Sequence, residues 1–462
     1  LNIMNTASIN PKVVLFIASF AAFIATFNET YLNVAFTSIA ETFSTDLITV
    51  KWLTTAYMLG AAVMIPISAY LYRTIKTRPL YFLSFIFLIG GSILSALSTS
   101  FPMLLAGRII QSIGTGILIP LEMNINIECA PREKLGVYIG VVISMTTIGP
   151  SASIIAAGSI LSFFDWRMLF WVYAAVCLVC LICGACLLKN IAEITHPKLE
   201  TVSVILISFG MICTMYGVST IFTGEFFVSL LSFILGIIFL VLFVLRQKRL
   251  ENPLINLQPL KVPQFSLGVI MNMLVIIAAF AMNIILPYYM QDYLGVDPMT
   301  ASLTIFPAIL LSSLFAPVAG RLSDNFGPAL IIPLGFVLMG VFTALLAAFI
   351  STGNAVLFAL LYIPVICGSS IILGPLQSYM LSKIPFQLNP HGVVILSTGF
   401  QLAGCIGSSV FTGIYAVFES VSGEAAFSTS AGIVALCMAA GLILSILLGC
   451  MSIRERRREF AP

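Results

Sequence analysis

Two acidic residues lie inside long apolar runs, where a charge is costly. Glu29 follows Asn28 in a run over residues 13–36, and Glu122 lies in a run over residues 102–127. An ionisable side chain within the hydrocarbon of a membrane costs at least a few kcal/mol, so it is by default a candidate functional group. A carboxyl group in such a place can exchange a proton, and its charged form attracts cations. The first chemistry that the sequence suggests is proton or cation exchange.

A basic residue, Arg108, shares the second of these runs. In a helical arrangement Glu29 and Arg108 lie at almost the same depth in the membrane. They can form an ion pair or a contact that depends on the proton, which would serve coupling. They can also form a static pair that only neutralises both charges. Glu122 follows Arg108 by 14 residues, about 21 Å along a helix and about 40° around it. Glu122 is either a proton or cation site, or an acid hydrated near the interface beside Arg132 or Lys134.

The composition indicates how these residues are held. Of the 462 residues 60% are hydrophobic and only 8% are charged, and the mean hydropathy is +1.10. Soluble domains carry about 25% charged residues, so the chain is predicted to be an all-α polytopic membrane protein. The net charge of +3 and the lack of a basic stripe exclude nucleic acid as an expected partner. The ten cysteines lie in or beside apolar runs, which predicts reduced thiols.

About 20 apolar residues cross a bilayer, and they cross it as a helix because hydrocarbon offers the backbone no other hydrogen-bond partner. On this rule we predict fourteen spans, near residues 13–36, 50–71, 79–99, 102–127, 136–161, 167–188, 202–222, 226–246, 265–291, 299–321, 328–350, 354–381, 392–417 and 428–452.

The charges predict the orientation of these spans. An even number puts both termini on one side, and assigning that side to the cytoplasm places 18 of the 21 Lys and Arg residues there. The exceptions are Lys51, Arg167 and Arg108. We therefore expect a polar N-terminal segment (1–12), a six-helix bundle (13–188), a linker with two extra spans and an amphipathic connector (189–264), a second six-helix bundle (265–452) and a basic cytoplasmic tail (453–462).

Several motifs occur in order on the expected spans. They are Trp52, Tyr57 and Leu59 in the second span, Arg108, Gln111, Gly114 and Gly116 in the fourth, Gly149-Pro150 in the fifth, Trp166-Arg167 at the sixth, and a loop from Gly320-Arg321 through Asp324 to Gly327. In this combination the chain resembles the major facilitator superfamily, and within it the fourteen-helix drug:proton antiporters of the QacA and EmrB type.

The resemblance implies a proton-coupled antiporter that exports amphipathic, cationic drugs or toxic compounds by alternating access across a bacterial-type cytoplasmic membrane. It implies no enzymatic activity and no cofactor beyond the proton gradient, with protons, small substrates and lipid as partners of a monomer. Two alternatives stay open. The chain could be a dedicated exporter or flippase of one metabolite, bile acid or lipid, or a non-transporting membrane sensor or scaffold.

The candidate residues fall into three groups. Proton coupling is assigned to Glu29, Glu122 and Arg108. The conformational motifs are Gly149, Pro150, Gly320, Arg321, Asp324 and Gly327. The expected cavity lining consists of polar and tyrosine residues from both halves: Asn28, Asn33, Gln111, Thr115, Asn126, Asn272, Asn283, Tyr288, Tyr289, Gln291, Gln377 and Gln401.

The chain also departs from the family pattern. The family's first-span aspartate aligns with Asn28, and the acid is its neighbour Glu29. In the first-half loop the signature aspartate is replaced by Arg73, whereas Asp324 keeps it in the second half. We expect Asp324 to face the positive N-terminus of the span that begins at Pro328. His391 lies in an expected loop, as does His196, so neither is predicted to relay protons within the membrane.

An aromatic stripe runs along the first span at spacings of three and four residues: Phe16, Phe20, Phe23, Phe27 and Tyr31. Such a stripe can bind flat or cationic compounds by stacking and cation–π contact, or it can form a seam between two helices.

Overall fold

The structure, a computed structural model, describes residues 11–45, 47–131, 134–188, 190, 194–195, 199–222, 226–296, 298–419 and 422–459. In these ranges every regular element is a helix, and fourteen helical segments are long and apolar enough to cross a membrane. The predicted fold class and the fourteen spans are confirmed. The polar segment before Pro11 and His196 lie outside the described residues.

The first half contains six spans. They are formed by α1 (Pro11–Thr30) with η1 (Tyr31–Ala35) and α2 (Phe36–Phe43), then α3 (Leu47–Thr74), α4 (Thr77–Ala96), α5 (Phe101–Cys129), α6 (Leu135–Leu161) and α7 (Arg167–Leu187). The first apolar run is therefore not one uniform helix. It changes to a 3₁₀ segment directly after Glu29 and Thr30, and such a change within a span often marks a functional hinge.

The rest of the chain contains eight spans. The inserted pair is α8 (Thr201–Thr220) and α9 (Phe226–Gln247), followed by a connector with η3 (Gln258–Lys261). The second half consists of α10 (Pro263–Asp292), α11 (Pro298–Phe326), α12 (Pro328–Phe349), η4 (Ile350–Thr352), α13 (Ala355–Ser382), η5 (Phe386–Leu388), α14 (Asn389–Glu419) and α15 (Gly423–Glu459).

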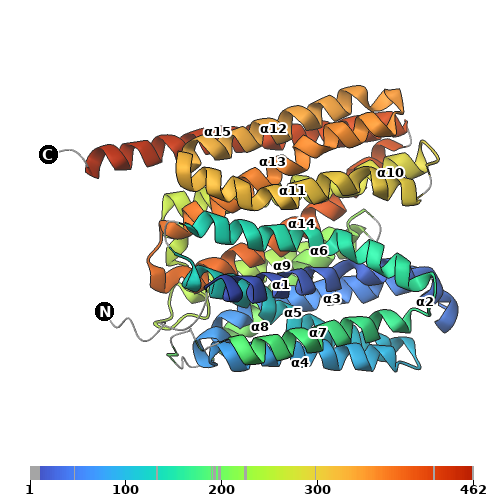
Figure 1. The fold of residues 1–462 in the computed structure, drawn as a ribbon, viewed down its shortest axis with the longest axis horizontal. Helices are drawn as coiled ribbons and strands as arrows, with labels where there is room; N and C mark the ends of the chain where they lie inside the picture. The colour runs from blue at the N-terminus through green and yellow to red at the C-terminus, as the bar shows by residue number, and fades with distance from the viewer. Residues whose placement is uncertain are drawn as a thin grey trace.

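The helices form two bundles that lie side by side with roughly parallel axes (Figure 1). One bundle contains α1 to α7 and the other α10 to α15, and they meet mainly where α6 packs on α11 and α13 and where α3 and α5 pack on α14. The start of α1 and the end of α15 lie at the same end of the molecule (Figure 1). We call it the basic end, because Arg73 at the end of α3 and Arg78 at the start of α4 lie there.

The inserted helices cover one side of the junction between the bundles. Ile207 and Met211 of α8 share an apolar cluster with Ala62 of α3 and Val394 of α14. Ser219 of α8 also lies within hydrogen-bond distance of Cys405 of α14, with Oγ and Sγ 3.3 Å apart. The pair thus seals the α3–α14 seam, while the α6–α11 seam on the other side of the junction is not covered by it.

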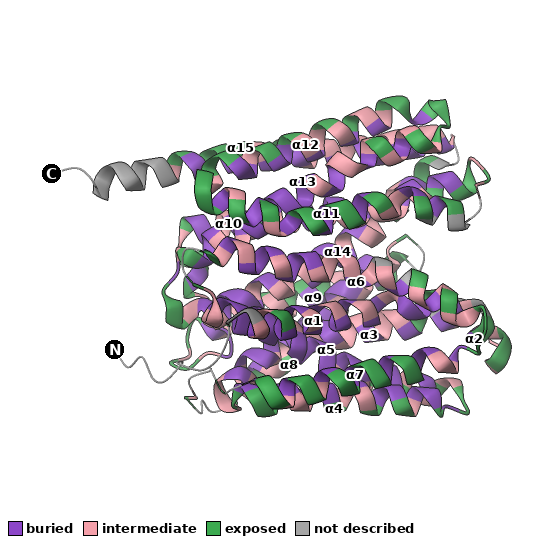
Figure 2. Cartoon of the chain, in the orientation of Figure 1, coloured by how far each residue is buried: buried purple, intermediate pink, exposed green. Residues whose placement is uncertain are grey.

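Burial follows the arrangement expected in a bilayer. Buried residues face the contacts between helices, and exposed ones line the outward surfaces of α7, α12 and α15 (Figure 2). Many exposed side chains are large and apolar, such as Phe227 of α9 at 82% exposure. In a soluble protein such a surface would cause aggregation, but in a membrane it contacts lipid.

Candidate substrate and proton site

Arg108 is the centre of a buried polar cluster in the first bundle. Its side chain is fully buried, and Nη1 donates to Asn28 Oδ1 at 2.9 Å and to Gln111 Oε1 at 2.8 Å. Nη2 donates to the backbone oxygen of Asn28 at 3.1 Å, and Nε donates to that of Leu53 at 3.4 Å. A neutral amide therefore occupies the place where the family pattern has an acid.

Two aromatic rings and a hydroxyl complete this cluster. The guanidinium carbon of Arg108 lies 4.1 Å from the centre of the Tyr57 ring and 5.6 Å from that of Tyr31. The Tyr57 hydroxyl is hydrogen-bonded to Thr115, one turn along α5 from Gln111. Cation–π contacts in a desolvated place contribute about 2 kcal/mol, so they help to keep the charge buried.

Glu29 does not form the ion pair with Arg108 that the sequence left open. Among the described residues the ion pairs are Asp165–Arg167 and Glu200–Arg246. The Glu29 side chain is only 4% exposed, and its Oε1 accepts a hydrogen bond at 3.3 Å from Gln401 Nε2 on α14. The physical reason is the one-residue shift from Asn28, about 100° around the helix, which turns the acid toward the second bundle.

Glu122 lies in the same helix as Arg108 but nearer the basic end. It is 3% exposed, and its Oε2 has no hydrogen-bond partner among the described residues. Asn126, one turn further on, donates to the backbone oxygen of Glu122 at 2.9 Å, while its own Oδ1 also has no partner there. A hydrated interfacial acid would be exposed, so the structure does not support that reading of Glu122.

The other expected cavity residues do not converge on one space. In the second bundle Gln377 donates to Asn272 at 2.9 Å, and Tyr362 donates to Asn283 at 2.6 Å. Tyr289 is buried and donates to the backbone of Ile350 at 3.3 Å. Three further residues are exposed: Asn33, which accepts from Thr54, and Tyr288 and Gln291 near the end of α10. In this conformation the expected lining is divided between separate polar pairs and the surface.

The aromatic stripe of the first span is a helix seam over its second part. Phe27 and Tyr31 stack on Tyr173 of α7, with ring centres 6.3 and 5.5 Å apart, and Tyr31 also meets Phe170 edge-on. At the other end of the stripe Phe16 is 66% exposed. The rings therefore hold α1 against α7 rather than facing the second bundle.

Asp324 joins the two bundles at the basic end. It accepts hydrogen bonds from the backbone N–H groups of Gly136 and Val137 at the start of α6. The sequence predicted that Asp324 faces the start of α12 at Pro328. That prediction is wrong, because the second-half loop lies against the first bundle. Gly320 packs on the backbone of Gly136, where a side chain would prevent contact.

The remaining conformational motif residues lie around these contacts. Gly149 lets α6 approach the backbone of α1 near Phe23 and Phe27, and the backbone oxygen of its neighbour Pro150 lies 3.5 Å from Thr30 Oγ1. Gly327 has φ +87°, which favours glycine, and it makes the turn between α11 and α12. Arg321 is exposed beside them.

A second cross-bundle contact at the basic end involves His391, and the prediction that this residue lies in a loop is wrong. His391 lies within α14 and is buried, with Nε2 3.4 Å from Arg73 Nη1. Its Nδ1 accepts from the backbone N–H of Asn256 in the connector at 3.2 Å. One imidazole thus ties together the end of α3, the connector and α14. The sequence offered two signals for this contact. His391 lies close to the start of a span that contains polar residues, and Arg73 stands in the first-half loop where the family has an aspartate.

The seam between α6 and α11 is tight toward the basic end and open further along. Gly140 packs on Ala316 and Pro317, and Ser144 donates to the backbone oxygen of Ser313. Beyond these contacts an apolar groove of about 250 Å³ separates the two helices, lined by Ile148, Ala152, Ile155, Ala156, Phe306, Ile309 and Leu310. The bundles are therefore closed at the basic end and diverge toward the opposite end along this seam.

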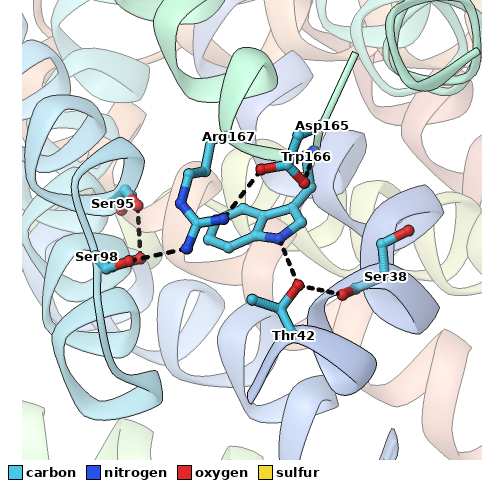
Figure 3. Close-up of polar contacts among 7 residues, drawn as sticks. All are labelled: Ser38, Thr42, Ser95, Ser98, Asp165, Trp166 and Arg167. Atoms are coloured by element: carbon cyan, nitrogen blue, oxygen red, sulfur yellow. Dashed lines mark hydrogen bonds and ion pairs between the residues drawn. The ribbon is translucent and has the colours of Figure 1, made fainter. Parts of the chain in front are cut away.

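At that opposite end a polar cluster fixes the first bundle internally (Figure 3). Trp166 Nε1 donates to Thr42 at 3.1 Å, and Arg167 donates to Asp165 at 3.0 Å and to the backbone of Ser98 at 3.2 Å. These contacts join α2, the end of α4 and the start of α7. They hold three helices as one body, which a rigid-body motion of the bundle requires.

Comparison with known proteins gives the family. The sequence profile of the Major Facilitator Superfamily matches residues 18–408, most of the chain. This chain belongs to the major facilitator superfamily. The resemblance inferred from the motifs is confirmed. The chain is therefore a transporter rather than an enzyme, and it crosses the bacterial cell membrane several times.

Several relatives within the superfamily have names that concern drugs or metabolites. The chain is 34% identical over 400 residues to the lincomycin resistance protein LmrB of Bacillus subtilis, covering 86% of this chain and 84% of that one. It is 26% identical over 428 residues to the riboflavin transporter RibZ of Clostridioides difficile, covering 92% of each. Among solved structures the human organic anion transporter MFSD10 has a TM-score of 0.61 at 14% identity, over 94% of this chain and 99% of that one. That likeness shows a shared fold.

Proposed function

We propose that this major facilitator is a proton-coupled antiporter that exports amphipathic, cationic compounds, with its basic end in the cytoplasm. The observation that carries the proposal is the hydrogen bond from Gln401 to Glu29, which crosses the interface between the bundles within the membrane. A titratable group at a moving interface can couple a proton to a conformational change. The lysine and arginine distribution supports the orientation.

The chemistry of coupling follows from one carboxylate. In its charged form Glu29 accepts the amide hydrogen bond from the second bundle, and the nearby Arg108 stabilises the charge through space. Protonation removes that charge and weakens the charge-assisted bond, so the two bundles separate more easily. Because Asn28 and Gln111 hold Arg108 in either case, the arginine keeps its position while Glu29 changes state.

The substrate class is supported less directly. Relatives are named for lincomycin resistance and multidrug resistance, which agrees with export of small toxic compounds. Among the described residues of the first bundle two acids are buried, Glu29 and Glu122, against one buried arginine, and this favours a cation over an anion as the transported species.

The test is transport in proteoliposomes that carry a pH gradient, with rhodamine 6G as an amphipathic cation. We expect Glu29→Gln to lower gradient-driven transport by about tenfold or more, the loss of one charge-assisted contact. Glu41→Gln is the matched control, since Glu41 is an exposed acid of α2, and it should transport normally. Full gradient-driven transport by the Glu29→Gln variant would overturn the coupling role.

The substrate range is tested with the same liposomes. Transport of several unrelated cations supports a multidrug exporter, and protection against a single chemotype would instead indicate a dedicated exporter. If no compound that binds the protein is moved by the gradient, the chain acts as a membrane sensor or scaffold.

A further inference from the structure

Several buried polar atoms have no hydrogen-bond partner among the described residues, and two of them are acceptors of α5 that the proposed coupling does not use. Glu122 Oε2 and Asn126 Oδ1 are acceptors one helical turn apart on α5, and neither has a partner among the described residues. Both side chains are almost fully buried, at 3% and 0% exposure. A buried acceptor without a donor costs about 1–3 kcal/mol, and more if it is charged, so the pair calls for a ligand that brings donors.

The residue that follows each member of the pair along α5 is apolar. Met123 and Ile127, its neighbours on α5, belong to one cluster with Ile139 and Val142 of α6 and Met271 of α10. Flexible, polarisable methionines adapt to ligands of different shape. An amphipathic molecule placed here would find apolar walls beside two acceptors.

No protein cation competes for Glu122 in the described part of the chain. Neither ion pair there includes it, and Arg108 lies about 21 Å away along α5. Arg73, on the neighbouring helix α3, is directed to His391, and the Tyr72 hydroxyl donates to Glu128 at 2.6 Å. Among the described residues no cation is therefore paired with Glu122, which leaves its charge open to a bound ligand.

Access to the pair depends on the bundle interface. The α6–α11 seam is closed at the basic end by Gly136, Gly140 and Ser144 against the second bundle. Glu122 lies only seven residues, about 10 Å, from the basic end of α5. The pair would open to that side when these contacts separate, whereas Glu29 lies toward the side where the bundles diverge.

We propose that Glu122 and Asn126 form a separate binding site for the protonated amine of a substrate, loaded from the basic end before the substrate reaches the level of Glu29. This inference rests on the proposed export function. Because the two acceptors need donors, the site favours an ammonium group that carries N–H bonds over a quaternary ammonium of equal charge. It thus names a substrate class, amphipathic protonated amines, and the residues that select it.

Equilibrium binding of dansylcadaverine tests this proposal. The probe joins a fluorescent apolar group to a primary amine, and its emission reports transfer to a dry site in purified protein without any gradient. We expect Glu122→Gln to weaken binding by about tenfold or more and Asn126→Ala by about threefold, the range of one charged and one neutral hydrogen bond. The N-acetylated probe, which lacks the charge, should bind both variants as it binds wild type.

Controls separate this site from a structural role and from coupling. Glu128→Gln changes another acid of α5, one that pairs with Tyr72, and should leave probe affinity unchanged. The N-trimethylated probe should bind wild type more weakly than the amine. Three outcomes would each overturn the proposal. The first is unchanged affinity of Glu122→Gln for the amine, and the second is a loss of affinity for the acetylated probe as large as that for the amine. The third is wild-type protein that binds the trimethylated probe as tightly as the amine. Since no gradient is used, failure of proton coupling leaves this result unaffected.

Discussion

At the scale of single residues, Arg108 shows how a buried cation is held without an acid in direct contact. Its guanidinium donates to Asn28, Gln111 and Leu53 and lies over the Tyr57 ring. All of these partners are neutral. They compensate much of the lost hydration by hydrogen bonds that the fixed, planar fork of the guanidinium can make at the same time. The charge on Arg108 is therefore available to act on Glu29 in both of its protonation states.

We predict that Arg108→Lys destabilises the protein although the charge is kept. A lysine ammonium is a compact group at the end of a shorter, flexible side chain, and it cannot reach Asn28, Gln111 and Leu53 together, so at least one buried acceptor loses its donor. The expected cost is about 2–4 kcal/mol, measured by thermal unfolding of the purified protein. Arg78→Lys is the control, because Arg78 is exposed, and should change stability little. An equal melting temperature for Arg108→Lys and wild type would contradict this account.

At the scale of helices, the two loop signatures use opposite charges for contacts across the interface. Asp324 caps the start of α6, where its negative charge complements the helix dipole. Arg73 occupies the equivalent place near the start of α14, where a positive charge has the wrong sign for the dipole. There the contact is made with the ring of His391. The first-half loop, in which the family's signature aspartate is replaced, thus still contacts the other bundle, through an arginine and a histidine instead of a carboxylate and backbone N–H groups.

The inserted helices provide a prediction about pH. Glu200, just before α8, accepts hydrogen bonds from Arg246 of α9 and from the backbone N–H of Ser203, and the Arg246 bond is the main cause that lowers the pKa of Glu200 to about 2. A carboxyl whose pKa is lower in the folded state contributes stability above its unfolded pKa of about 4.3, and this contribution is lost as the pH falls toward 2. We expect the hydrogen-exchange protection factors of the first turns of α8, which are corrected for the intrinsic pH dependence of exchange, to fall over that window.

The comparison is Glu200→Gln. It should show lower protection factors in α8 already at neutral pH and no further fall between about pH 4.3 and 2, because the group that titrates there is gone. Glu251→Gln, at an exposed position in the connector, should behave as wild type. If the Glu200→Gln variant kept the same acid response, the ion pair would not be what holds α8 to α9.

At the scale of the whole molecule, the two bundles are closed at the basic end and apart at the opposite end along the α6–α11 seam. Closure depends on close backbone approach, since a Cβ atom added at Gly140 would lie 2.6 Å from the Ala316 oxygen and 3.0 Å from Pro317 Cα. The inserted helices stabilise only the α3–α14 seam on the other side. Small residues at the first seam therefore permit the close contact at the basic end.

We predict that Gly140→Ala shifts the protein toward the state that is open at the basic end. The added methyl group overlaps the second bundle only when that end is closed, a cost of about 1–3 kcal/mol. Distances between spin labels at the basic ends of α6 and α11 should lengthen. Gly158→Ala in the same helix is the matched control, because nothing lies within 4 Å of its Cβ position, and its distances should match wild type. Unchanged distances in Gly140→Ala would show that closure does not depend on this contact.

The sequence by itself determined the elements and the candidate residues of this protein. Because a bilayer requires long apolar helices, hydropathy located all fourteen spans to within a few residues, except that it could not show the 3₁₀ segment after Thr30. Helical periodicity also placed Arg108, Gln111 and Thr115 on a common polar face of α5, and the structure buries all three.

Only the tertiary structure decided which of these residues meet. Glu29 pairs with Gln401, 372 residues away, Asp324 caps a helix of the other bundle, and His391 contacts Arg73. The physical reason is that periodicity assigns a side chain to a face of its own helix but says nothing about which helix lies opposite. That is decided by close packing at positions such as Gly136 and Gly140, where two bundles far apart in sequence come into contact.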